Sequence, residues 1–192
     1  MTTVTTPVGA GPAPTLRRLY VARSGFALVW AVLVFATASG IGPLTAVLLV
    51  AYPVFDVAAA VVDVRSSRGS AAGGSGNGAV AGLYVNIAIS TLAAVGLVVA
   101  LGSGIPGVLR VWGVWAVVAG LVQLVVAVRR RRLGGQWAMI ASGAISVLAG
   151  ISFVLMASNA GASLTVVAAY ALLGGIFFLV SALRLHRTTG NG

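Results

Sequence analysis

Long apolar runs dominate the pattern of hydrophobic and polar positions along the chain. They lie at residues 19–39, 44–64, 79–101, 106–128, 137–157 and 162–183. A helix of about 20 apolar residues crosses the ~30 Å hydrocarbon layer of a bilayer. A membrane-spanning β-strand would show about ten residues of alternating polarity instead, and these runs do not alternate. The pattern therefore predicts an all-α, polytopic membrane bundle of six transmembrane helices over residues 16–187.

Composition supports a lipid environment. The chain has 192 residues, of which 59% are hydrophobic and 7% are charged. A soluble domain carries about 25% charged residues, because polar groups must face water. There is no cysteine and only one histidine, so we expect no disulfide, no metal site and no cofactor.

The arginines predict the orientation of the helices. All twelve basic residues are arginines, and only one of them, Arg110, falls on the side of the short loops. The positive-inside rule places the arginine-rich side in the cytoplasm, so both termini are expected there. Arginine without lysine, among so much alanine and glycine, is typical of a GC-rich bacterial genome. We therefore expect a multi-pass protein of the bacterial inner membrane.

The densest charge run is Arg129, Arg130, Arg131 and Arg132. Arginines next to a membrane span contribute roughly 1 kcal/mol each against an anionic leaflet. We interpret this run as topogenic and as a contact for anionic inner-leaflet lipids, and we expect no nucleic-acid partner. A second copy of the chain or another membrane protein is left open as a partner.

Three segments between and around the runs are polar or small. Residues 1–15 are rich in Thr, Pro and Gly and lack the apolar core of a signal peptide, so we expect a disordered tail. Residues 65–78 are mostly Gly and Ser, which predicts a flexible cytoplasmic linker. Residues 188–192 form a short C-terminal tail.

The loops alternate between short, uncharged connections and longer, arginine-bearing ones, which divides the domain into three helical hairpins. The hairpins end alike, in Asp63-Val64-Arg65, Ala127-Val128-Arg129 and Ala182-Leu183-Arg184. When these ends are superposed, Asp56, Gly120 and Gly175 coincide. We interpret the chain as three copies of one two-helix repeat.

These hairpins resemble a known family. An aromatic residue opens each odd helix (Tyr20, Tyr84 and Trp137), and glycines recur in the even helices, at Trp112-Gly113 to Gly120 and at Gly174-Gly175. In this the chain resembles the HdeD-like family of small bacterial membrane proteins. The resemblance implies a non-enzymatic role that is structural, stress-related or partner-stabilising. The first hairpin departs from it, because Asp56 stands where the others have glycine.

Asp56 is the candidate centre of an intramembrane polar cluster. It lies nine residues before Arg65, hence about 13 Å into the membrane. An acid at that depth must face the bundle and find a partner; Asn86, Gln123 and Ser142 lie at a comparable depth. The cluster either binds a proton or gates a path, or it only fixes helix packing.

Three other polar residues have plainer interpretations. Arg23 and Asp63 are expected at a similar depth near the membrane edge, where they either form an ion pair or reach water separately. Arg110 either reaches the outer headgroups or contacts an anion. His186, between two tail arginines, is expected to be an exposed bystander.

The sequence carries no recognised catalytic arrangement, phosphate-binding loop or dinucleotide fingerprint, so we expect no enzyme. Two functions are left: the structural or stress-related role implied by the resemblance, and a small transporter or channel, proton-linked through Asp56.

Overall fold

The computed structural model describes residues 12–69, 77–129 and 137–189. These residues form the helices α1 (Pro12–Thr37), α2 (Pro43–Gly69), α3 (Asn77–Ala100), α4 (Gly104–Arg129), α5 (Trp137–Met156) and α6 (Thr165–Thr189), with the short 3-10 helix η2 (Leu101–Ser103) between α3 and α4. The described part of the chain contains no strand. The prediction of an all-α fold is confirmed.

Several helices are longer than their apolar runs. α1 begins at Pro12 rather than at Leu19, so it includes the last residues of the predicted tail 1–15. Proline suits the first turn of a helix, whose N–H groups have no acceptor within the helix. α6 continues to Thr189, beyond the predicted boundary at Leu183. The remainder of the predicted tails, and residues 70–76 of the predicted linker, lie outside the described residues.

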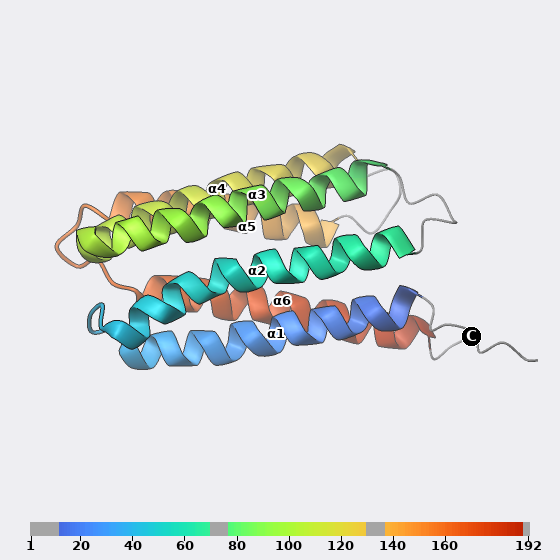
Figure 1. The fold of residues 1–192 in the computed structure, drawn as a ribbon, viewed down its shortest axis with the longest axis horizontal. Coiled ribbons are helices and arrows are strands. Elements are labelled where there is room, and N and C mark those ends of the chain that lie inside the picture. The colour runs from blue at the N-terminus through green and yellow to red at the C-terminus, as the bar shows by residue number, and fades with distance from the viewer. Residues whose placement is uncertain (1–11, 70–76, 130–136, 190–192) are drawn as a thin grey trace, which may run out of the picture.

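The helices lie side by side along the long axis of the molecule (Figure 1). The short connections from α1 to α2, from α3 to α4 and from α5 to α6 lie together at one end. α1 begins and α6 ends at the opposite end. Each helix contacts the next in sequence and α6 also contacts α1, so the helices close into a ring.

The apolar helices indicate a membrane protein. Among the described residues, the helical segments long and apolar enough to span a bilayer are Arg18–Thr37, Pro43–Arg65 and Val80–Val128, the last of which includes both α3 and α4. Shorter apolar helices cover Ile140–Met156 and Thr165–Val180. Large apolar side chains also cover the outward faces of the bundle, with Val99 74% and Leu92 72% exposed. Such a surface is suited to lipid rather than to water.

Glycines allow α4 and α5 to approach each other at backbone distance. A Cβ atom added to Gly113 would lie 2.6 Å from the carbonyl oxygen of Gly150, and one added to Gly150 would lie 2.5 Å from the carbonyl oxygen of Gly113. Gly120 and Gly143 oppose each other in the same reciprocal way, at 2.8 and 2.9 Å. Small residues of α4 and α5 thus face each other and form one interface.

The half of the bundle that contains the short connections has an apolar core. Leu49, Leu97, Val108 and Leu164 are fully buried there. At the middle of the molecule this core ends in a cluster of four aromatic rings from α1, α2 and α4: Trp30, Tyr52, Trp112 and Trp115. The cluster separates this apolar half from the half that contains Arg23 and Asp56.

Candidate functional site

A cavity of about 380 Å³ lies inside the ring of helices, and every helix from α1 to α6 contributes to its lining. It occupies the half of the bundle in which α1 begins and α6 ends, and Tyr52 and Trp115 of the aromatic cluster form its floor. Cavities that bind small molecules usually measure about 300–1,000 Å³. This one is at the small end of that range.

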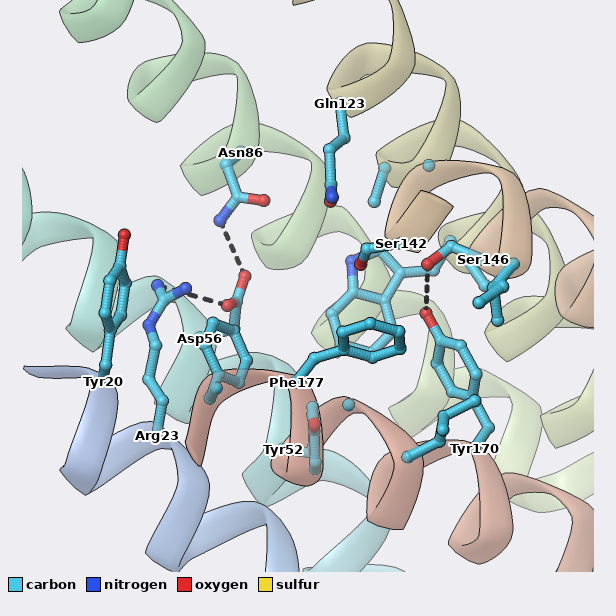
Figure 2. Close-up of a pocket in the computed structure, with 18 of the residues that line it drawn as sticks. Tyr20, Arg23, Tyr52, Asp56, Asn86, Gln123, Ser142, Ser146, Tyr170 and Phe177 are labelled. Atoms are coloured by element: carbon cyan, nitrogen blue, oxygen red, sulfur yellow. Dashed lines mark hydrogen bonds and ion pairs between the residues drawn. The ribbon is translucent and has the colours of Figure 1, made fainter. Parts of the chain in front are cut away.

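Asp56 of α2 is the polar centre of the cavity (Figure 2). Its Oδ2 accepts a hydrogen bond of 2.7 Å from the amide Nδ2 of Asn86 and one of 2.8 Å from the hydroxyl of Ser90, both on α3. Its Oδ1 lies 3.5 Å from a guanidinium nitrogen of Arg23 on α1. Three side chains from two neighbouring helices therefore hold this carboxylate in place.

Arg23 is held loosely despite its burial. Its side chain is 17% exposed and that of Asp56 is 21% exposed. A strong guanidinium–carboxylate hydrogen bond measures about 2.7–2.9 Å, which is clearly shorter than the distance in this pair. The guanidinium also lies 5.4 Å from the centre of the Phe178 ring on α6, and its buried Nε has no hydrogen-bond acceptor among the described residues. Arg23 therefore keeps donor capacity that Asp56 does not use.

The opposite wall of the cavity is polar as well. Gln123 of α4 and Ser142 of α5 line it, and the hydroxyl of Tyr170 on α6 donates a hydrogen bond of 2.9 Å to the hydroxyl of Ser146 on α5. Phe177 lies between this pair and Asp56 in Figure 2. The cavity thus has a charged side on α1 and α2, a neutral polar side on α4 and α5, and aromatic rings between them.

Trp115 connects the floor of the cavity to its charged side. Its indole N–H donates a hydrogen bond of 3.2 Å to the Ser90 hydroxyl, which in turn donates to Asp56. The Trp115 ring lies 4.9 Å from that of Trp112 and 6.0 Å from that of Tyr52. Two consecutive hydrogen bonds therefore link Asp56 to the aromatic cluster.

The structure brings the four residues of the predicted polar cluster to one cavity. Asp56, Asn86, Gln123 and Ser142 all line it, and Asp56 and Asn86 are in direct contact. Whether they act as a functional site stays a prediction.

The predicted partner of Arg23 is Asp63, whereas the ion pair at 3.5 Å joins Arg23 to Asp56. Because α1 begins at Pro12, Arg23 lies eleven residues into the helix, and Asp56 lies thirteen residues before the end of α2. The two charges are therefore at similar depths in antiparallel neighbours. Asp63 lines the same cavity two turns further along α2 and experiences the charge of Arg23.

The other predicted positions lie elsewhere. Arg110 is exposed near the start of α4, away from the central cavity. Arg130, Arg131 and Arg132 fall outside the described residues, as do the side chains of Arg129 and His186.

The sequence analysis missed Ser90, Trp115, Ser146 and Tyr170. Serines and aromatic residues are common in apolar helices, so each one alone carries little signal. Helical spacing could have identified Ser90, because it follows Asn86 by four residues and therefore lies on the same face of the helix.

Among the described residues, no group of three or more His, Cys, Asp or Glu side chains is placed to hold a metal ion.

In comparisons with known proteins, no family model, curated protein or solved structure matches the chain.

Proposed function

We propose that this chain is an integral membrane carrier that binds a small polar solute in its central cavity, with Asp56 as a proton-linked coupling group. One observation supports this most directly: a loosely paired Arg23 and Asp56 face a cavity of about 380 Å³ within the membrane domain. Ionisable residues inside membrane spans are energetically costly and usually mark a solute, ion or proton pathway.

The contacts of the charged pair suggest how a solute would bind. A polar solute has the spare donors of Arg23 on one side and the amide and hydroxyl groups of Gln123, Ser142 and Ser146 on the other. A proton on Asp56 would neutralise the carboxylate that holds Arg23, and would free the guanidinium to bind the solute. The aromatic cluster blocks the other half of the bundle, so release on that side requires the cluster to rearrange.

The proposed topology has six membrane crossings with both termini in the cytoplasm of a bacterial inner membrane. The arginine distribution supports this orientation. We also propose that the bundle consists of three hairpin repeats of HdeD-like type. The superposed positions support the repeat, because each faces the next odd helix: Asp56 faces α3, Gly120 faces α5 and Gly175 faces α1.

A second candidate is the non-enzymatic structural or stress-related role that the resemblance implies. The contacts of Asp56 favour it, because each carboxylate oxygen already has at least one partner from α1 or α3. In that case the pair serves only to fix these helices against each other.

Reconstituted liposomes distinguish the two functions. A defined library of amino acids, amines and sugars is applied to proteoliposomes that enclose a pH-sensitive dye, with and without an imposed pH gradient. A carrier will show solute-dependent proton movement or gradient-driven uptake that Asp56→Asn abolishes. Thr91→Val is the matched control, because Thr91 is exposed on the outer side of α3 and its hydroxyl donates to the Ile87 carbonyl of its own helix. Flux no greater than that of empty liposomes for the whole library would favour the structural role.

A further inference from the structure

A second hollow lies on the outside of the bundle, between α3 and α4. Its volume is about 360 Å³, and all the side chains that line it are apolar or aromatic except that of Arg110. Leu92 of α3 and Val114 of α4 are 72% and 58% exposed on its walls. The hollow is therefore an apolar groove with a single positive charge.

The charge lies at one end of the groove. Arg110 is exposed six residues after the start of α4, near the end of the bundle that contains the short connections. Trp115 and Val118 line the groove further along the same helix. At 1.5 Å per residue, the distance from Arg110 to Val118 along the axis is about 12 Å, so the groove extends from the charge toward the middle of the membrane domain.

We propose that this groove binds an anionic phospholipid, with the phosphate on Arg110 and one acyl chain along α4 as far as Trp115 and Val118. Guanidinium is well suited to phosphate because it offers several donors in a plane. The order of the groups matches a lipid in a bilayer: the charged group lies near the end of the bundle, and the apolar walls continue inward. The groove lies on the lipid-facing surface, so the lipid needs no path through the protein.

The bound chain would touch a residue that also belongs to the central cavity. Trp115 lines both the outer groove and the cavity, and its indole bonds to Ser90 beside Asp56. A lipid in the groove therefore packs against one side of the wall that supports the polar centre. The lipid site itself does not depend on the proposed transport.

The tryptophans of the chain provide a direct readout. Of the four, Trp30 and Trp112 are 2% and 0% exposed, whereas Trp137 is 80% exposed at the start of α5. In a Trp137→Phe protein, quenching by lipids brominated on the acyl chain will report mainly on Trp115. Brominated phosphatidylglycerol is compared with brominated phosphatidylcholine in mixed nanodiscs.

We expect phosphatidylglycerol to associate about fivefold more strongly than phosphatidylcholine, which corresponds to roughly 1 kcal/mol for one basic residue against an anionic headgroup. Arg110→Gln will abolish the preference, Arg110→Lys will retain most of it, and Trp115→Phe will remove the quenching signal. Equal quenching by both lipids would overturn the proposal. So would a preference that survives in Arg110→Gln, provided that circular dichroism shows the fold intact.

A second copy of the chain is the competing occupant of the groove. Because the protein has no cysteine, Val114→Cys gives a single thiol on the groove wall. If the groove binds lipid, the Val114→Cys protein should stay monomeric under mild oxidation in nanodiscs that each hold two protein molecules. A disulfide-linked dimer in high yield would assign the groove to a protein contact and overturn the proposal.

Discussion

The α4–α5 and α2–α3 interfaces both border the central cavity, the first at Gly120 and the second at Asp56. At the first, glycines bring two backbones so close that an added Cβ atom would lie 2.5–2.9 Å from a carbonyl oxygen of the other helix. At the second, Asn86 and Ser90 donate to a carboxylate from 2.7 and 2.8 Å. The first interface depends on glycines that have no side chain, and the second depends on hydrogen bonds between side chains.

The difference shows two ways in which helices associate in lipid. Close packing of small residues holds two helices together without any polar group. A polar interface is held by hydrogen bonds and an ion pair, and its groups can exchange partners. The backbone contact of α4 with α5 is therefore expected to be rigid, whereas the polar contacts of α2 with α3 are expected to be able to rearrange.

The largest effect is expected from Arg23→Gln, which leaves the largely buried Asp56 carboxylate, 21% exposed, without its cation. Loss of one partner of a buried pair costs about 3 kcal/mol, and unfolding of the detergent-solubilised protein measures it. Asp56→Asn should cost less, because Arg23 still experiences the charge of Asp63. The double variant should recover most of the loss; a strictly additive loss would show that the two charges do not stabilise each other.

A smaller effect is expected at the glycine interface. Gly150→Ala places a methyl group 2.5 Å from the Gly113 carbonyl oxygen, and overpacking of this kind costs about 2 kcal/mol. Gly25→Ala is the matched control in α1, since a Cβ atom there meets nothing within 4 Å. Denaturation in detergent should show a loss for the first variant only. Equal stability of the two variants would mean that α4 and α5 are not in backbone contact.

Ser90→Ala tests the contribution of a single hydroxyl group to the α2–α3 interface. It removes one of the two hydrogen bonds to Asp56 Oδ2 and the acceptor of the Trp115 indole, at a cost of about 1.5 kcal/mol. Tryptophan emission should shift at the same time, because Trp115 loses its partner. Thr91→Val, the neighbouring substitution on the outer face, should leave both stability and emission unchanged.

The smallest effect is expected at a contact that belongs to neither interface. Tyr170→Phe removes the hydrogen bond from α6 to Ser146 on α5, which contributes about 0.5 kcal/mol. Stability should therefore hardly change, whereas solute affinity should fall if the hydroxyl faces the solute. A loss of stability as large as that of Gly150→Ala would assign Tyr170 a structural role.

Much of the helical architecture could be predicted from the apolar runs, because segments of that length and composition form helices in lipid. The predicted ends of the helices were less accurate, as at Pro12 and Thr189, because a hydropathy pattern does not show how far a helix continues into water.

For the candidate site, the sequence predicted only the depth of its residues in the membrane. Counting residues from the helix ends brought Asp56 and Asn86 to one level, and the structure places them in contact. The same counting paired Arg23 with Asp63, which stays a prediction, and it did not pair Arg23 with Asp56, because the start of α1 lies in a Thr/Pro-rich segment. Trp115 and Tyr170 carried no signal, since their role depends on which helices face each other across the cavity.

The sparse contact between α5 and α6 has a further consequence. In the described part of the chain these two helices touch less than any other pair of sequence neighbours, and their links include the Tyr170–Ser146 hydrogen bond and the Phe153–Tyr170 ring contact. Moving α6 away from α5 would therefore disrupt less packing than opening the ring anywhere else. A gap there would lead sideways from the bilayer into the cavity, and would admit molecules that are dissolved in the membrane.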